Sequence, residues 1–160
     1  MTYRTFTEAL KDLGLDLPTV NPPRGSYVPA IAAGDLLFVA GQAPRLNGEL
    51  KFSGRVGREL TIEQGREAAK LCALNILSHL SCATHNDTSR VVTTVRLAGV
   101  VNCAEDFTAH SQVMDAASDL IAQVLGSAGQ HVRIATGASS LPSRMAVEIE
   151  GIFMLKRTSC

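Results

Sequence analysis

Two residues near the end of the chain, Arg133 and Glu148, have the types and setting that could do chemistry. Arg133 is the one charge in a short run of small and apolar residues, 132–138. In the run 146–155, alternation places Glu148 and Glu150 on the face opposite their apolar neighbours. β-branched residues at period two, with a proline confined to the connection, predict two extended segments. Such a strand pair would build a polar pocket on an apolar sheet, or would carry an ordinary cross-strand ion pair on a solvated face.

A set of short motifs in a fixed order resembles the YjgF/RidA family, also known as endoribonuclease L-PSP-like. Its C-terminal part is Arg133, followed by Leu141-Pro142 and by the Val-Glu-Ile-Glu segment 147–150. The upstream motifs are Gly25-Ser26-Tyr27, the segment 34–44 and Gly54-Arg55-Val56-Gly57. The resemblance covers roughly residues 25–155 and indicates a longer branch of the family. We therefore expect residues 1–24 to form an N-terminal helix and extended connector, and residues 25–160 a single YjgF/RidA-like domain.

The resemblance implies a fold, an assembly and an activity. The fold would be α+β and chorismate-mutase-like, with a mixed β-sheet and two long helices packed on one face. The family assembles as a homotrimer with ligand clefts between subunits. Members of the RidA type hydrolyse reactive enamines and imines to a 2-oxo acid and ammonia, and they need neither a cofactor nor a metal. The implied ligand is a small carboxylate-bearing imine or enamine, or the 2-oxo acid product.

The resemblance also assigns roles to individual residues. Arg133 matches the arginine that binds the substrate carboxylate, and guanidinium geometry suits that task. Glu148 matches the glutamate that holds the attacking water. Tyr27 matches the tyrosine that closes over the ligand from another subunit. Gly41 and Gln42 belong to the strand end that lines the cleft.

Two positions of the expected substrate site depart from the common family pattern. Ala135 stands where many RidA proteins carry a cysteine, and Ser111 stands where they carry an asparagine. The first change removes a reactive thiol, so redox switching through that position is not expected. The second change alters how the ligand would be oriented.

Three classes of function stay open on the sequence: an imine deaminase, a small-carboxylate-binding trimer without turnover, and an endoribonuclease. The 15 basic residues balance the 15 acidic residues, and tryptophan is absent. Neither an electrostatic footprint for nucleic acid or membrane nor an aromatic platform for bases is expected. No histidine pair has the spacing of a general acid and base. The third class is therefore the weakest.

Cysteine and histidine usage argues against a disulfide or metal framework. The four cysteines are Cys72, Cys82, Cys103 and Cys160, and none forms a Cys-x-x-Cys pair. They are expected to be reduced thiols, with Cys72 as core filler on a helix. The histidines are scattered, so a zinc site is not expected. The N-terminus lacks an apolar signal core and no apolar run approaches membrane-spanning length, which predicts a cytoplasmic protein.

The remaining patterns predict the elements that must position these residues. Helices are expected at residues 5–13, 61–84 and 107–125, and strands at 26–33, 35–42, 91–101, 132–138 and 146–155. The second helix opens on a capping box at Thr61 and the third ends at Gly126. Residues 45–60 are expected to be a glycine-rich loop, either flexible or, less plausibly, nucleotide-clamping. Several strands are apolar on both faces while two long helices cover only one, so a second subunit should cover the other.

Overall fold

The protein was examined as a computed structural model that describes residues 5–157; Cys160 lies outside this range. The helices are α1 (Phe6–Asp12), α2 (Ile62–Thr84) and α3 (His110–Leu125), with 3-10 turns η1 (Thr88–Arg90), η2 (Gly126–Gly129) and η3 (Pro142–Arg144). The strands are β1 (Ala30–Ala33), β2 (Leu36–Gln42), β3 (Arg45–Leu46), β4 (Glu49–Leu50), β5 (Val91–Asn102), β6 (Val132–Ala138) and β7 (Val147–Leu155). This order is an α+β fold, as the sequence predicts.

The main sheet is mixed and has five strands in the order β1-β2-β7-β5-β6. The β5–β6 pair is parallel, and the other neighbouring pairs are antiparallel. A parallel pair needs a crossover, and α3 supplies it between β5 and β6. β7 then returns along the other side of β5. The expectation that β6 and β7 form an adjacent pair is therefore wrong, because β5 lies between them.

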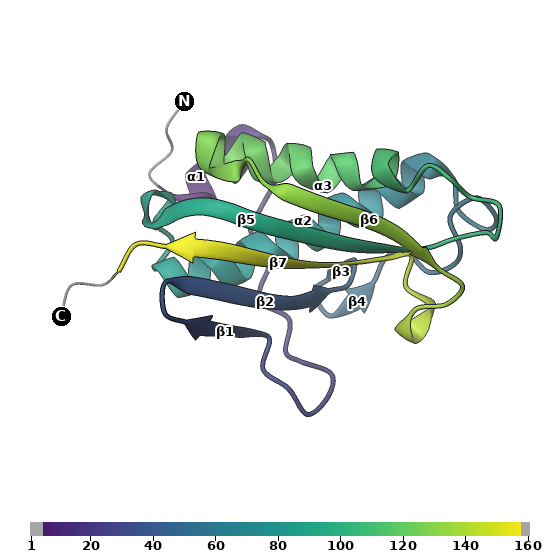
Figure 1. Ribbon diagram of the computed structural model, residues 1–160, viewed down its shortest axis with the longest axis horizontal. Helices are drawn as coiled ribbons and strands as arrows, with labels where there is room; N and C mark the ends of the chain where they lie inside the picture. The colour runs from purple at the N-terminus through teal and green to yellow at the C-terminus, as the bar shows by residue number, and fades with distance from the viewer. Residues whose placement is uncertain (1–4, 158–160) are drawn as a thin grey trace.

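Two long helices cover one face of this sheet, and β2, β7 and β5 pass in front of α2 in Figure 1. Thr61 caps α2 in a capping box with Gln64, and Gly126, at φ 60°, ends α3. The predicted apolar stripes of both helices lie in the core. On α2 these are Ala69, Cys72, Ala73, Ile76, Leu77 and Leu80; on α3 they are Val113, Ala117, Leu120, Ile121 and Val124.

The N-terminal helix shares this core. Thr5 caps α1 in a capping box with Glu8. Phe6 and Leu10 are fully buried in the same cluster as the two long helices. Burying a side chain of this size contributes about 1.5–3 kcal/mol each. The segment 13–29 then runs from α1 to the sheet and passes Asn75 of α2, as described below.

Two elements start three or four residues later than the sequence predicts, and one predicted loop contains two short strands. The first strand starts at Ala30 rather than Ser26, because Pro29 has no N–H to donate to a neighbouring strand. α3 starts at His110 rather than Phe107. The predicted loop 45–60 contains the hairpin β3–β4, whose Asn47-Gly48 turn has positive φ at both positions. Within the same segment Val56 is fully buried and bonded to Asn102 and Ala104, so this loop is anchored rather than flexible.

The second face of the sheet is apolar, and none of the residues 5–157 covers it. Ile31, Phe38 and Ile152 are cross-strand neighbours, as are Val132 with Arg96 and Ile134 with Ala98. Ile31, Val132 and Ile134 are half or more exposed, at 59%, 67% and 50%. We call this surface the open face. The expectation of two helices on one face and an apolar second face is confirmed.

Candidate functional site

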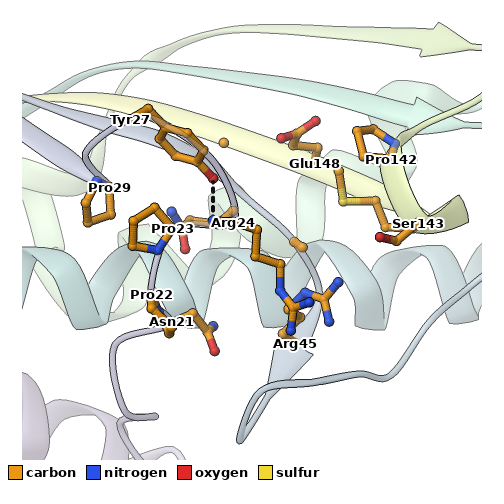
Figure 2. Close-up of a pocket in the computed structure, with 14 residues that line it drawn as sticks. Asn21, Pro22, Pro23, Arg24, Tyr27, Pro29, Arg45, Pro142, Ser143 and Glu148 are labelled. Carbon is orange, nitrogen blue, oxygen red and sulfur yellow. Dashed lines mark hydrogen bonds between the residues drawn. The ribbon is translucent and has the colours of Figure 1, made fainter.

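A pocket of about 390 Å³ lies where β2 ends, and Glu148 of β7 lines it. Its lining includes Tyr27, Gly41 and Gln42, three further residues that the family resemblance assigns to the site. Figure 2 shows the Glu148 carboxylate and the Tyr27 ring on the same side of this pocket. One wall is the connection between β6 and β7, where Ser143 has the left-handed backbone that non-glycine residues rarely adopt.

Gly41 makes room for the Glu148 side chain. A Cβ at Gly41 would lie 2.4 Å from Oε1 and 2.8 Å from Cδ of Glu148. The β2–β7 register shifts between Val39 and Gln42, so Gly41 sits in a bulge. Gln42 is buried, and its side-chain amide donates to the carbonyl of Ala40, 2.9 Å away, across this bulge. Bulges of this kind re-aim side chains next to active sites.

Glu148 is a half-buried carboxylate without a cation to neutralise it. Among residues 5–157 it forms no ion pair, whereas Glu150 on the same strand pairs with Arg96 at 3.6 Å. Burial raises the pKa of Glu148, and the negative charge of Glu150 raises it further. A carboxyl group with a raised pKa can take and return a proton nearer neutral pH than an ordinary glutamate.

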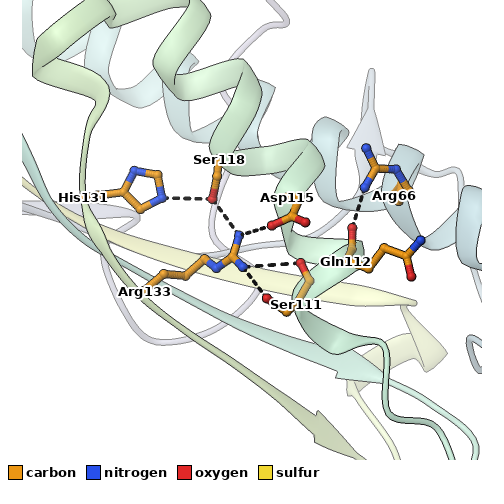
Figure 3. Close-up of polar contacts among 7 residues, drawn as sticks. All are labelled: Arg66, Ser111, Gln112, Asp115, Ser118, His131 and Arg133. Atoms are coloured by element: carbon orange, nitrogen blue, oxygen red, sulfur yellow. Dashed lines mark hydrogen bonds and ion pairs between the residues drawn. The ribbon is translucent and has the colours of Figure 1, made fainter.

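Arg133 is held by one face of α3 instead of facing Glu148 (Figure 3). Its Nη1 donates to Asp115 Oδ1 at 3.0 Å and to Ser118 Oγ at 2.9 Å. Its Nη2 donates to Ser111, at 2.7 Å to Oγ and 3.4 Å to the backbone carbonyl. Ser118 in turn contacts His131 Nε2 at 2.9 Å, and His131 Nδ1 contacts the carbonyl of Gly129 at 2.7 Å. If Nδ1 carries the proton, it donates to the Gly129 carbonyl, and Ser118 accepts from Arg133 and donates to Nε2.

Arg133 and Glu148 lie on opposite faces of the sheet. Arg133 is the register partner of Leu97, which is buried under the helices, while Glu148 is the partner of Val100. Residues 97 and 100 on one strand point to opposite faces. A polar pocket containing both side chains within one chain, and an ion pair between them, are therefore both excluded.

The expected site residues thus fall into two groups. Tyr27, Gly41, Gln42 and Glu148 share the pocket, whereas Ser111 contacts Arg133 at α3. Ala135, two residues after Arg133, is half-buried and packs against the core. Sequence reasoning missed Asp115 and Ser118 as partners of Arg133. The sequence did contain an indication of this contact, because residues 111, 115 and 118 have the i, i+4, i+7 spacing of one helical face.

Comparison with known proteins assigns the family. The family model described as "YjgF/chorismate_mutase-like, putative endoribonuclease" matches residues 8–149. The chain belongs to the YjgF family. Protein TCP17 of Trypanosoma cruzi is 37% identical over 147 residues, 91% of each chain.

Two solved structures show the same YjgF fold at high similarity. The protein Atu1372 of unknown function from Agrobacterium tumefaciens is 38% identical, with a TM-score of 0.88 over 94% of this chain and 92% of its own. A protein from Shewanella oneidensis described as a "putative endoribonuclease" is 32% identical, with a TM-score of 0.90 over 94% of this chain and 99% of its own. These matches span nearly the whole chain.

A second cavity of this YjgF chain, about 570 Å³, is lined by the thiol of Cys103 and the imidazole of His110. The sequence did not predict that these two groups meet. Cys103 Sγ lies 3.5 Å from His110 Nε2, and Gly137 leaves the space that both side chains occupy. Burial raises the pKa of the Cys103 thiol, which favours the protonated, unreactive form. The same holds more strongly for Cys72, in agreement with its prediction as core filler.

Residues 5–157 contain no group of three or more histidine, cysteine or acidic side chains that could hold a metal ion. Within the same range, no helix is long and apolar enough to span a bilayer.

Proposed function

We propose that this protein hydrolyses small imines or enamines that carry a carboxylate, at a cleft between the subunits of a homotrimer. The observation that carries the proposal is Glu148: a half-buried carboxylate of raised pKa, without a cationic partner among residues 5–157, set in a pocket that Gly41 keeps open. Such a group is suited to moving protons to and from water.

The reaction needs one base and no external reagent. Glu148 takes a proton from water as the water oxygen attacks the imine carbon, and the C=N bond becomes a C–N bond. The protonated Glu148 then returns that proton to the nitrogen, which gives the carbinolamine. Glu148 next takes the hydroxyl proton and passes it to the amine, so that the C–N bond breaks, ammonia leaves and the hydroxyl oxygen becomes the C=O. The balance is imine plus water to 2-oxo acid plus ammonia. The imine carbon is already electrophilic, so proton transfer is the main task of the protein.

Arg133 of the partner subunit would bind the substrate carboxylate. Its two bonds to Ser111 involve neutral acceptors, which a carboxylate can replace with stronger charge-assisted bonds. Its bond to Asp115 would stay and hold the guanidinium plane in place. Ser111 and Ala135 would then border the bound ligand, and Tyr27 would cover it.

Two observations support a trimer. The open face needs a cover that residues 5–157 do not supply, and the family assembles as trimers. The two groups of site residues lie on opposite faces of one sheet, so a subunit contact is what brings an Arg133 to a Glu148.

The test separates binding from chemistry. Arg133→Ala should weaken the binding of 2-oxobutyrate by about 2–5 kcal/mol, because a charge-paired carboxylate loses its partner. Glu148→Gln keeps the shape and should bind the acid nearly normally, while turnover falls about a hundredfold to ten-thousandfold with the loss of the base. Calorimetry measures the first effect, and ammonia release from a freshly generated imine measures the second.

Arg157→Ala serves as the control, because Arg157 is exposed, pairs with Asp35 and lies outside the pocket. It should change neither readout. If the wild type binds 2-oxobutyrate but does not speed ammonia release, the result would favour the alternative function, a carboxylate-binding trimer without turnover. Equal binding by Arg133→Ala and wild type would show that Arg133 serves only its α3 network.

A further inference from the structure

Two arginines, Arg24 and Arg45, line the same pocket as Glu148. Arg24 Nη2 and Arg45 Nη1 each donate to the same carbonyl oxygen, that of Gly48, at 3.3 Å. Figure 2 shows the two arginines near each other in this pocket. Among residues 5–157 neither guanidinium forms an ion pair. Burial, and then the charge of Arg24, lower the pKa of Arg45, as expected for two cations held close together. Two positive charges sharing one neutral acceptor leave most of their donors free for an anion.

The backbone that carries the two arginines is fixed by a buried amide. Asn75 of α2 is 1% exposed. Its Nδ2 donates to the carbonyls of Ala43 and Arg45, at 3.0 and 2.9 Å, and its Oδ1 accepts from Asn21 at 3.1 Å. Asn75 therefore ties the N-terminal connector to the turn after β2. The meeting of Arg24 and Arg45 rests on this tie rather than on two free surface side chains.

Glu148 does not use the arginine pair as its own counter-charge. It shares the pocket with them, yet its pKa is raised and not lowered. A nearby cation that paired with Glu148 would lower that pKa. The positive charge of Arg24 and Arg45 is therefore available to a ligand. The pocket volume of about 390 Å³ lies in the range of about 300–1,000 Å³ typical of small-molecule sites, which leaves room for a small organic acid.

We propose that Arg24 and Arg45 bind a second anionic group of the ligand, so that the preferred substrate is the imine of a 2-oxo dicarboxylate rather than of a monocarboxylate. Each planar guanidinium group can donate two parallel N–H hydrogen bonds to the two oxygens of one carboxylate. The choice of a 2-imino acid as the ligand rests on the proposed function. Within that function, Arg133 of the partner subunit would hold one carboxylate and the arginine pair the other.

The experiment compares 2-oxoglutarate with 2-oxobutyrate by calorimetry on the full chain. Wild type should bind the dicarboxylate more tightly. Arg24→Gln and Arg45→Gln should each lower the ratio of the two affinities by about tenfold, the effect of losing one charge-assisted hydrogen bond. The double variant should bring the ratio close to one. Arg157→Gln, which removes a positive charge outside the pocket, is the matched control and should leave the ratio unchanged.

Both arginines can be replaced without touching the core, and a thermal unfolding curve confirms that each variant is folded. A wild-type ratio near one, or a double variant that keeps the preference, would overturn the inference. Either result leaves the proposed function standing if Glu148→Gln still slows ammonia release. The proposed function would fail in a different way: the wild type would not speed ammonia release from the imine of either 2-oxoglutarate or 2-oxobutyrate.

Discussion

At the scale of single residues, Glu148 concentrates the features that a proton-transfer group needs. Its carboxylate is half-buried, unpaired among residues 5–157 and next to a second negative charge on the same strand. Each of these costs free energy when the group is ionised, so the structure keeps an unfavourable charge at this position. Unfavourable charges of this kind are common at active sites, where the raised pKa is useful.

The pH dependence of the rate should follow the Glu148 pKa. Glu148 acts as a base only when ionised, so kcat/KM should fall as pH drops through its pKa, above the ordinary range of a glutamate. Glu150→Gln removes the negative charge that raises this pKa. The acid limb of the pH–rate profile should therefore move to lower pH in that variant.

The control for this shift is Glu63→Gln, because Glu63 is an exposed acid at the start of α2, outside the pocket. It should leave the acid limb in place. A profile whose acid limb is the same in wild type and Glu150→Gln would mean that another group controls it.

At the scale of elements, the bulge in β2 and the strand β7 together set the Glu148 carboxylate. The register shift between Val39 and Gln42 places Gly41 across from the Glu148 side chain, with no space for a Cβ. On the other side of the sheet, the polar face of α3 orients Arg133 through Asp115, Ser118 and Ser111. The irregular part of one strand and the polar face of one helix therefore position the two proposed functional groups.

Gly41→Ala should slow turnover while the fold is retained. The added methyl group would meet the end of the Glu148 side chain, which can rotate away, so stability should change little and the carboxylate should lose its position. A misplaced catalytic group of this kind can cost on the order of a hundredfold in rate. Ammonia release and a thermal unfolding curve measure the two effects.

A double variant shows whether Gly41 acts through Glu148. If it does, Gly41→Ala combined with Glu148→Gln should be no slower than Glu148→Gln alone. Additive losses in the double variant would instead point to a general distortion of β2.

At the scale of the whole molecule, the main feature is the open face, which residues 5–157 of a single chain leave uncovered. It presents large apolar side chains from four neighbouring strands, with Arg96 and Glu150 as an ion pair among them. Exposed apolar surface of this kind is typical of protein–protein contact sites. A homotrimer would cover it and would also bring the two separated groups of site residues together.

The protein should sediment as a trimer, and Ile134→Glu should produce a monomer. Ile134 is 50% exposed on the open face, so a charge there would be buried without a partner in the assembly. The monomer should lose ammonia release as well, because its Arg133 and Glu148 lie on opposite faces. Analytical ultracentrifugation at micromolar concentration reports the assembly.

Leu13→Glu is the matched control, since Leu13 is 38% exposed at the end of α1 and away from the open face. It should remain a trimer. A wild-type protein that is monomeric at micromolar concentration would remove both the assembly and the shared cleft.

The sequence alone determined most of the local structure. The apolar stripes of α2 and α3, the capping box at Thr61 and the stop at Gly126 were all predicted, because helix periodicity and capping depend on neighbours within a few residues. The family motifs selected Tyr27, Gly41, Gln42 and Glu148, which the structure brings to one pocket.

Only the tertiary structure decided how distant segments meet. It placed β5 between β6 and β7, set Arg133 and Glu148 on opposite faces, and brought Arg24 beside Arg45. Local spacing does not fix strand order, because consecutive strands are neighbours in a sheet only about two-thirds of the time. The partner of Arg133 and the anion pocket follow from that order and from the buried Asn75. Both depend on contacts between segments that are distant in the sequence, such as that of Asn21 with Asn75.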